Sequence, residues 1–251
     1  IDVYENEGKR SGAYSWGHYD VHPYVLLNHT DTLDSMFTIA HEMGHSLHSL
    51  YSWKNQPYAY SDYKIFVAEV ASTFNEALLT EYLLNTIDDK SKRLYILNHY
   101  FESVKGTVFR QTMFAEFEKI IHQRAEEGEA LTSELLCSIY HDLNLKYFGP
   151  EMVVDSNIDM EWARIPHFYT SFYVYKYATG FSAATALSQK ILKCEPGALE
   201  RYLDFLKSGG SDYPINQLKS AGVDMTSPEP VISCLKVFEK YLDEFESLLK
   251  E

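Results

Sequence analysis

Most of the chain repeats apolar residues at helical spacing, and only its beginning departs from this pattern. Residues 1–30 are rich in glycine and tyrosine, with short alternating runs such as GAYSWGHYDVHPYVLL, which predict short strands joined by turns. Beyond them, either Asp31 or Thr32 can cap a helix that runs to about Lys54. The pattern therefore predicts a small β element near the N-terminus, followed by a helical body.

The helical pattern continues to the end of the chain. After a polar connection at Pro57, a second helix is expected over about 64–85, with its apolar stripe in FVAEVASTFNEALLTEYLL. Ser91 is the candidate cap of a long helix that reaches about residue 128. Four more helical segments are expected, at 132–147, 167–193, 198–210, which two glycines close, and 230–251. With no internal repeat and no low-complexity linker, residues 1–251 are predicted to form a single, mainly α domain.

Composition narrows the chemistry that such a domain can carry. The chain is 45% hydrophobic and 15% aromatic, which is enough for a substantial core, and its net charge of −14 argues against a nucleic-acid surface. No apolar run approaches the roughly 20 residues of a membrane span. Three widely separated cysteines without a CxxC spacing argue against a disulfide framework or a cysteine metal site.

The strongest chemical signal is the segment TIAHEMGHSLHSLYS, residues 38–52, which contains the HExxH pattern. On a helix, His41 and His45 lie one turn apart and direct their imidazoles at a common point, while Glu42 lies on the flank. This arrangement is typical of two zinc ligands and a general base. The alternative is a helix with two half-exposed histidines. Gly44 costs a helix roughly 1 kcal/mol relative to alanine, which suggests that something approaches it closely.

A catalytic zinc site needs a third protein ligand. His48 lies seven residues after His41, about 10 Å along an unbroken helix, so it is expected in the cleft or behind a ligand. Glu69, in the apolar stretch FVAEVASTFNEALL, is the better candidate because an unpaired carboxylate there would be costly. Glu76 faces the same side and could accept an N–H from a ligating histidine. The alternative is that both glutamates are surface charges.

The segment HFYTSFYVYKY offers hydrogen-bond donors for a developing oxyanion. These donors are His167, Tyr169, Tyr173, Tyr175 and Tyr177. If the segment is helical, Tyr175 points about 200° away from Tyr173, so the donors cannot all face one cleft. The alternative is that the tyrosines fill a core with their hydroxyls at its rim.

The segment KRSGAYS is a weaker signal for substrate binding. Gly12 and Ala13 are small enough for the backbone of a substrate to pair with a strand edge beside them. An ordinary turn glycine explains the same residues.

Together these segments resemble the oligoendopeptidase F branch of the thimet oligopeptidase family of zinc metallopeptidases. Four motifs occur in the family's order over nearly the whole chain: GKRSGAYSWGHYDVHPYVLLN, AHEMGHSLHSLYS, FVAEVASTFNEALL and RIPHFYTSFYVYKYATGFSAATAL. The resemblance implies a helical, zincin-type (gluzincin) metallopeptidase domain with one zinc ion per chain. It also implies that the chain is the C-terminal catalytic part of a longer enzyme, whose N-terminal portion helps to wall the substrate channel.

The resemblance implies a role for each candidate residue. Three would ligate zinc: His41, His45 and Glu69. Two would bind the oxyanion: His167 and Tyr175. Glu42 would be the base that activates the zinc-bound water, Glu76 would sit behind a ligand, and Tyr169 would contact the substrate.

The expected function is zinc-dependent cleavage of internal bonds in short oligopeptides, in the cytoplasm, without a nucleic-acid or membrane partner. A zinc carboxypeptidase is the nearest alternative. It would need a cation for the substrate's C-terminal carboxylate, and Arg164, just before His167, is available. The other alternative is a metal-binding fragment that is inactive without the missing N-terminal portion.

Overall fold

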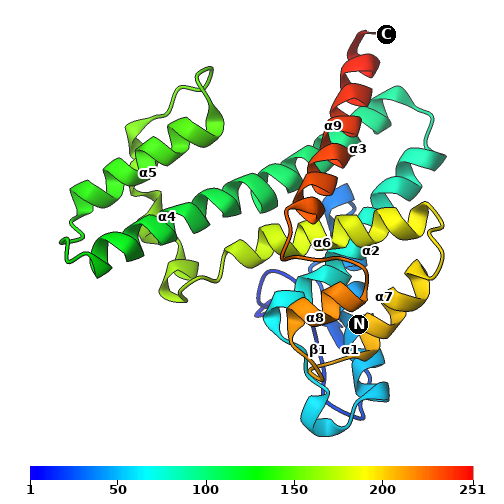
Figure 1. Cartoon of the computed structure of the whole chain (residues 1–251). Helices are drawn as coiled ribbons and strands as arrows, with labels where there is room; N and C mark the ends of the chain where they lie inside the picture. Colours follow the sequence, from blue (N-terminus) through cyan, green and yellow to red (C-terminus); the bar gives the residue numbers. More distant parts are fainter. Residues whose placement is uncertain (251) are drawn as a thin grey trace. The chain divides into compact units, whose positions relative to one another are not determined.

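The computed structural model describes residues 1–250, and their secondary structure is almost entirely helical (Figure 1). This confirms the prediction of a mainly α chain with a small β element near its start. The described residues divide into two compact units. Unit 1 combines residues 1–102 with the segment from Thr179 onward, and unit 2 is Ser103–Ala178. That residues 1–251 act as one catalytic domain stays a prediction.

The β element is an antiparallel pair of three-residue strands, β1 (Tyr14–Trp16) and β2 (Tyr24–Leu26). Ser15 lies opposite Val25. The backbone N–H of Asp2 donates to the carbonyl of Val25 over 2.8 Å, on the side of β2 away from β1. Within residues 1–250, β1 therefore has a strand neighbour along one edge only.

Two long helices follow, α1 (Leu33–Asn55) and α2 (Ile65–Thr86), close to the predicted bounds. Of the two candidate caps, Asp31 and Thr32, it is Thr32 that caps α1, because its side chain accepts a hydrogen bond from the backbone N–H of Ser35. The helices pass very close to each other at Gly44, where a Cβ would lie 2.5 Å from the Cα of Ser72. Only glycine fits at this point. The group that was expected to approach Gly44 closely is therefore the backbone of α2.

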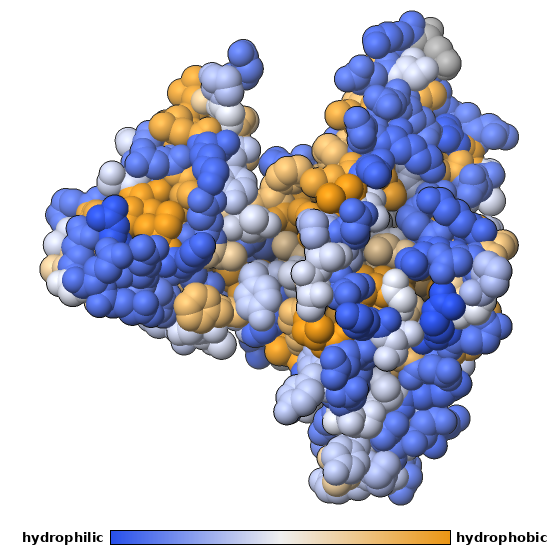
Figure 2. All heavy atoms as spheres, in the orientation of Figure 1, coloured by the Kyte–Doolittle hydropathy of each residue, from blue (hydrophilic) through white to orange (hydrophobic). Residues whose placement is uncertain are grey.

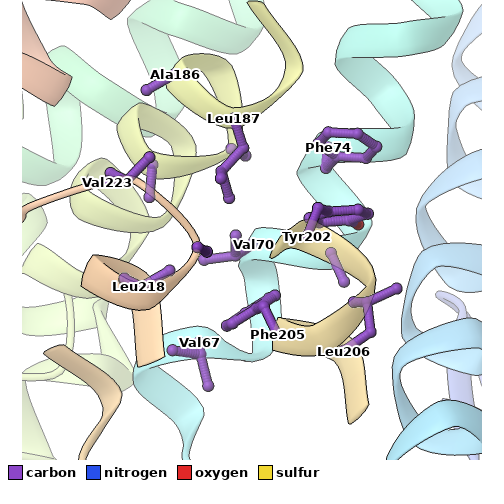
Figure 3. Close-up of a cluster of buried hydrophobic side chains, with 14 residues drawn as sticks. Val67, Val70, Phe74, Ala186, Leu187, Tyr202, Phe205, Leu206, Leu218 and Val223 are labelled. Carbon is purple, nitrogen blue, oxygen red and sulfur yellow. The ribbon is translucent and has the colours of Figure 1, made fainter. Parts of the chain in front are cut away.

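The core of unit 1 is built around α2 (Figure 3). Apolar side chains of α2 meet those of α6 (Tyr175–Leu192), α7 (Ala198–Lys207) and α8 (Pro214–Ser220). The buried residues labelled in the figure are Val67, Val70, Phe74, Ala186, Leu187, Tyr202, Phe205, Leu206, Leu218 and Val223. The short helix α8 was not predicted from the sequence, although Pro214 suits its first turn. The packing holds α2, and the residues it presents, in a fixed position.

The long helix predicted over 91–128 has three parts. They are α3 (Lys90–Val104), a π-helical stretch η2 (Lys105–Phe109) and α4 (Arg110–Glu126). Its cap is Asp89 rather than Ser91, because the Asp89 carboxylate accepts the N–H of Lys92 over 2.9 Å. The chain later closes with α9 (Glu229–Lys250), and Glu251, the last residue of the helix predicted there, lies outside the described residues.

In unit 2, α4 packs against α5 (Ser133–Phe148), which starts after its predicted cap Thr132. Two short 3-10 helices follow, η3 (Ser156–Arg164) and η4 (Pro166–Tyr169). The predicted helix over 167–193 is wrong in its first part, since α6 begins only at Tyr175.

A left-handed turn explains the late start of α6. Phe172 has a φ of 55°, which interrupts a right-handed helix. Its backbone N–H donates over 2.9 Å to the carboxylate of Glu118, a side chain in α4 that is 1% exposed. The sequence pattern carries no signal for this distant anchor.

The surface is largely polar. Figure 2 shows hydrophilic side chains over most of the visible face, interrupted by smaller apolar patches. Among residues 1–250, no helix combines the length and the apolar character that a bilayer crossing requires.

Candidate metal centre

Three side chains from α1 and α2 converge on one point. The Nε2 atoms of His41 and His45 lie 3.2 Å apart, and the Oε2 atom of Glu69 lies 3.3 Å from the first and 3.6 Å from the second. Ligands bound tetrahedrally to zinc at about 2.0–2.1 Å are themselves roughly 3.3 Å apart. Two imidazole nitrogens and one carboxylate oxygen therefore fit a zinc ion in both chemistry and spacing.

A surplus of carboxylate surrounds these ligands. Nδ1 of His41 is hydrogen bonded to Oε1 of Glu76, which lies about two turns after Glu69 on the same face of α2. Burial lowers the pKa of His41, but hydrogen bonds to Glu69 and Glu76 outweigh it and raise the pKa to about 10. Burial raises the pKa of Glu69, yet the hydrogen bond from His41 and the charge of His45 bring that pKa below its ordinary value. The cluster thus favours a positive charge at its centre.

Neighbouring groups orient the other two ligands. The ring of His45 donates a hydrogen bond to the backbone of Ala68, and burial lowers its pKa, which favours the neutral imidazole that binds metals. The hydroxyl of Ser72 donates to Oε2 of Glu69 over 3.3 Å. Each ligand is therefore held by a group outside the cluster.

Glu42 lies beside the cluster in a dry environment. It is only 6% exposed, and its Oε2 atom has no hydrogen-bond partner in the described part of the chain. The backbone of Ser15 in β1 hydrogen bonds to its carboxyl, but burial dominates and raises the pKa of Glu42. A carboxylate with a raised pKa and an open oxygen is suited to accept a proton.

The cluster and Glu42 open into a pocket of about 650 Å³ that lies within unit 1. One wall is β1 with its flanking residues, including Ala13, Ser15 and Gly17. Because Val25 bonds to Asp2 on the far side of β2, its partner Ser15 directs its backbone groups away from β2, to the open edge.

Gly12 lies at the end of this wall but does not line the main pocket. With Ala13 it lines a smaller adjoining hollow. Its φ of 94° belongs to the left-handed region, and its carbonyl accepts a hydrogen bond from the Asn28 side chain over 2.8 Å. Gly12 therefore shapes the turn that leads into β1.

His48 does not line the pocket, contrary to the expectation of a cleft residue. It is 1% exposed and stacks on Tyr63 with ring centroids 3.7 Å apart. Burial, together with the nearby His45, lowers the pKa of His48 to about 3, so it stays neutral. The helix directs His48 into the core. This agrees with the spacing argument that His48 is not a metal ligand.

The remaining candidates belong to unit 2. Nε2 of His167 lies 3.3 Å from the hydroxyl of Tyr177, and the ring of Tyr173 lies 5.6 Å from the imidazole. Tyr169 is 87% exposed, and Tyr175 is the first residue of α6. The structure thus groups His167 with the hydroxyl of Tyr177 and the ring of Tyr173.

Two supporting residues could not be identified from the sequence. Ser72 follows Glu69 by three residues, and a serine at helical spacing from a ligand is a weak signal for its role. Ser15 acts through its backbone and leaves no signal in the residue type.

The model of peptidase family M3 matches residues 1–237 of the chain. The chain belongs to peptidase family M3. Over 249 residues it is 62% identical to oligopeptidase PepF of Bacillus subtilis, covering 99% of this chain and 37% of that protein. Over 251 residues it is 52% identical to the chromosomal oligoendopeptidase F of Lactococcus lactis, covering 100% of this chain and 42% of that protein. The resemblance to the oligoendopeptidase F branch is therefore confirmed.

Two solved structures of similar proteins share the fold. The crystal structure of oligoendopeptidase F from Enterococcus faecium matches with a TM-score of 0.79 and 52% identity, over 87% of this chain and 40% of that one. The crystal structure of a peptidase from Chlamydophila abortus matches with a TM-score of 0.89 and 50% identity, over 98% of this chain and 41% of that one. This chain thus spans about 40% of the length of the relatives that it matches.

Proposed function

We propose that the chain carries the zinc-dependent catalytic centre of a peptidase that cleaves internal bonds of short peptides. The observation that supports this most is the convergence of His41, His45 and Glu69 beside a buried Glu42, all at one pocket. Membership of a peptidase family and similarity to oligoendopeptidases support the same reaction. One zinc ion would be held by each chain.

The chain's residues have distinct tasks in this proposal. A zinc ion held by the three ligands would lower the pKa of water toward about 7 and polarise the scissile carbonyl. Glu42 takes the proton of the attacking water at its open oxygen and passes it to the leaving amine. Glu76 fixes the ring of His41 through Nδ1, so that Nε2 faces the ion.

The substrate backbone pairs with the open edge of β1 in an extended form. Ser15 presents its backbone carbonyl there, since its N–H donates to Glu42, and Ala13 lines the same wall, while Gly12 shapes the turn before the strand. His167 and Tyr175 donate hydrogen bonds to the oxyanion, and Tyr169 contacts the substrate, as the family motif implies.

Carboxypeptidase activity is the less favoured alternative. It needs a cation to hold the substrate's terminal carboxylate, but the guanidinium of Arg164 is already hydrogen bonded to Glu161. We therefore favour cleavage of internal bonds, with residues 1–251 acting as one catalytic domain in the cytoplasm. The additional portion found in longer relatives would be the partner that completes the substrate channel.

A fluorogenic peptide blocked at both ends tests the proposal. The zinc-loaded chain should cleave it, either alone or after the remaining part of a long relative is added in trans, and a chelator should abolish cleavage. Cleavage only of peptides with a free C-terminus would favour the carboxypeptidase. Failure to bind zinc at one ion per chain would overturn the proposal.

A further inference from the structure

The pocket wall formed by residues 57–63, between α1 and α2, is held rigidly by two glycines. The backbone N–H of Gly210 donates to the carbonyl of Tyr60 over 2.8 Å. A Cβ on Gly209 would lie 2.2 Å from that carbonyl oxygen, and one on Gly210 would lie 2.5 Å from the carbonyl oxygen of Asp62. Only glycine fits at positions 209 and 210, because the backbone of the wall passes so close to them.

The residues on either side of Asp62 are anchored as well. Ser61 is buried, and its carbonyl accepts the hydroxyl of Ser52 over 2.5 Å. The hydroxyl of Tyr63 lies 2.9 Å from that of Ser49 in α1. Asp62 itself lines the pocket and stays exposed, so its carboxylate is presented from a fixed backbone.

The charge of Asp62 is not balanced by its surroundings. Within residues 1–250, its carboxylate has no hydrogen-bond or ion-pair partner, and the pocket lining contains no lysine or arginine. Among the carboxylates that line the pocket, Glu42 and Glu69 together balance a divalent ion, which leaves Asp62 as the surplus negative charge. Aromatic rings line the same pocket, namely Tyr19, Trp53, Tyr58 and Tyr63. A carboxylate among aromatic faces suits a cationic group.

We propose that Asp62 is a specificity residue that selects peptides with a cationic group near the cleaved bond. This rests on the proposed function, because it assigns the substrate class of the same pocket. Ile65 is one helical turn before Glu69, and Asp62 is three residues earlier, which places it on the order of 10 Å from the metal ligands. We therefore expect the cationic group of the substrate to lie two to four residues from the cleaved peptide bond.

Equilibrium binding tests the proposal without requiring turnover. The zinc-loaded chain carrying Glu42→Gln is titrated with labelled, doubly blocked neutral peptides, in which one lysine replaces glutamine at successive positions. One lysine position should bind about 2- to 5-fold more tightly than the neutral peptide, and added salt should reduce the gain. A peptide without lysine but with a free N-terminus carries its positive charge on the α-amino group, and it distinguishes that group from a side chain as the source of the cation.

Variants of Asp62 decide the assignment. Asp62→Asn should remove the lysine preference and leave the affinity for the neutral peptide unchanged, and Asp62→Lys should favour a glutamate peptide instead. Asp243→Asn, an exposed carboxylate on α9, removes the same charge outside the pocket and should keep the preference. A preference that survives Asp62→Asn, or that Asp243→Asn removes equally, overturns the role of Asp62. Binding of no peptide, even after the remaining part of a long relative is added in trans, would instead refute the peptide pocket and the proposed function with it.

Discussion

The α1–α2 pair and the segment from Pro166 to Tyr175 present their candidate residues in different ways. In the pair, all candidate ligands stand on regular helices that meet at a single close point, Gly44. In the segment, His167 and Tyr169 lie on a 3-10 turn, and an irregular stretch separates them from α6. Helix register positions the first set, whereas a few anchoring contacts position the second.

The two regions should therefore fail in different ways. A packed helix pair resists local change but tolerates no added volume where the backbones touch. An irregular segment tolerates changes of side-chain volume at its exposed residues, but it depends on the hydrogen bonds that hold its backbone. Four predictions test this contrast.

The largest effect is expected in the helix pair. Glu42→Gln should lower kcat by about 10²–10⁴, because the amide cannot accept the proton of the attacking water. Zinc content should stay at one ion per chain, since Glu42 is not among the converging ligands. Steady-state kinetics with the blocked peptide and metal analysis measure both. Glu126→Gln, an exposed residue of α4, should change neither. Full turnover by Glu42→Gln would remove this residue from its role as base.

The next effect tests whether the irregular segment takes part in the reaction. Tyr175→Phe should lower kcat by about 10²–10³ with little change in KM, because one donor to the oxyanion is lost. Tyr213→Phe, at an exposed tyrosine of unit 1, is the matched control and should be neutral. If Tyr175→Phe retains full activity, the segment supplies no essential donor through this hydroxyl.

The sequence predicted the two regions unequally, for physical reasons. HExxH and the glutamates of the next helix lie at helical spacing, so geometry favoured the candidates that the structure brings together, and the family resemblance supplied the choice among them. The same spacing argument gave a helix over 167–174 that does not exist. The left-handed turn at Phe172 depends on Glu118, more than 50 residues earlier, and no local pattern encodes that contact.

Gly44→Ala tests the contact point of the helix pair. Alanine favours helices by about 1 kcal/mol, but its Cβ would overlap the α2 backbone, so we expect a net loss of about 1–3 kcal/mol in the free energy of unfolding. Zinc affinity should fall as well, because Glu69 would shift away from the histidines. Gly106→Ala is the control, since a Cβ there meets no atom within 4 Å. Urea unfolding and zinc titration compare the two, and equal behaviour would contradict the close-contact argument.

The smallest effect concerns the anchor of the irregular segment. Glu118 accepts the N–H of Phe172 with one oxygen, while its other oxygen is buried without a partner. Burial raises the pKa of Glu118 above the ordinary value of 4.5. The folded protein therefore holds this proton more tightly than the unfolded chain, and the contribution of Glu118 to stability falls as pH rises from about 4.5 through the raised pKa.

Glu118→Gln removes that titration but keeps an acceptor for Phe172. The variant should match the wild type near pH 4.5 and become more stable than it at neutral pH, by less than about 1 kcal/mol. Glu118→Ala lacks the acceptor, so hydrogen exchange at the Phe172 amide should accelerate. Glu126→Gln, on the same helix, should retain the wild-type pH dependence. If Glu118→Gln also retains it, the buried carboxylate does not titrate as described. Unchanged exchange at Phe172 in Glu118→Ala would show that other contacts hold the turn.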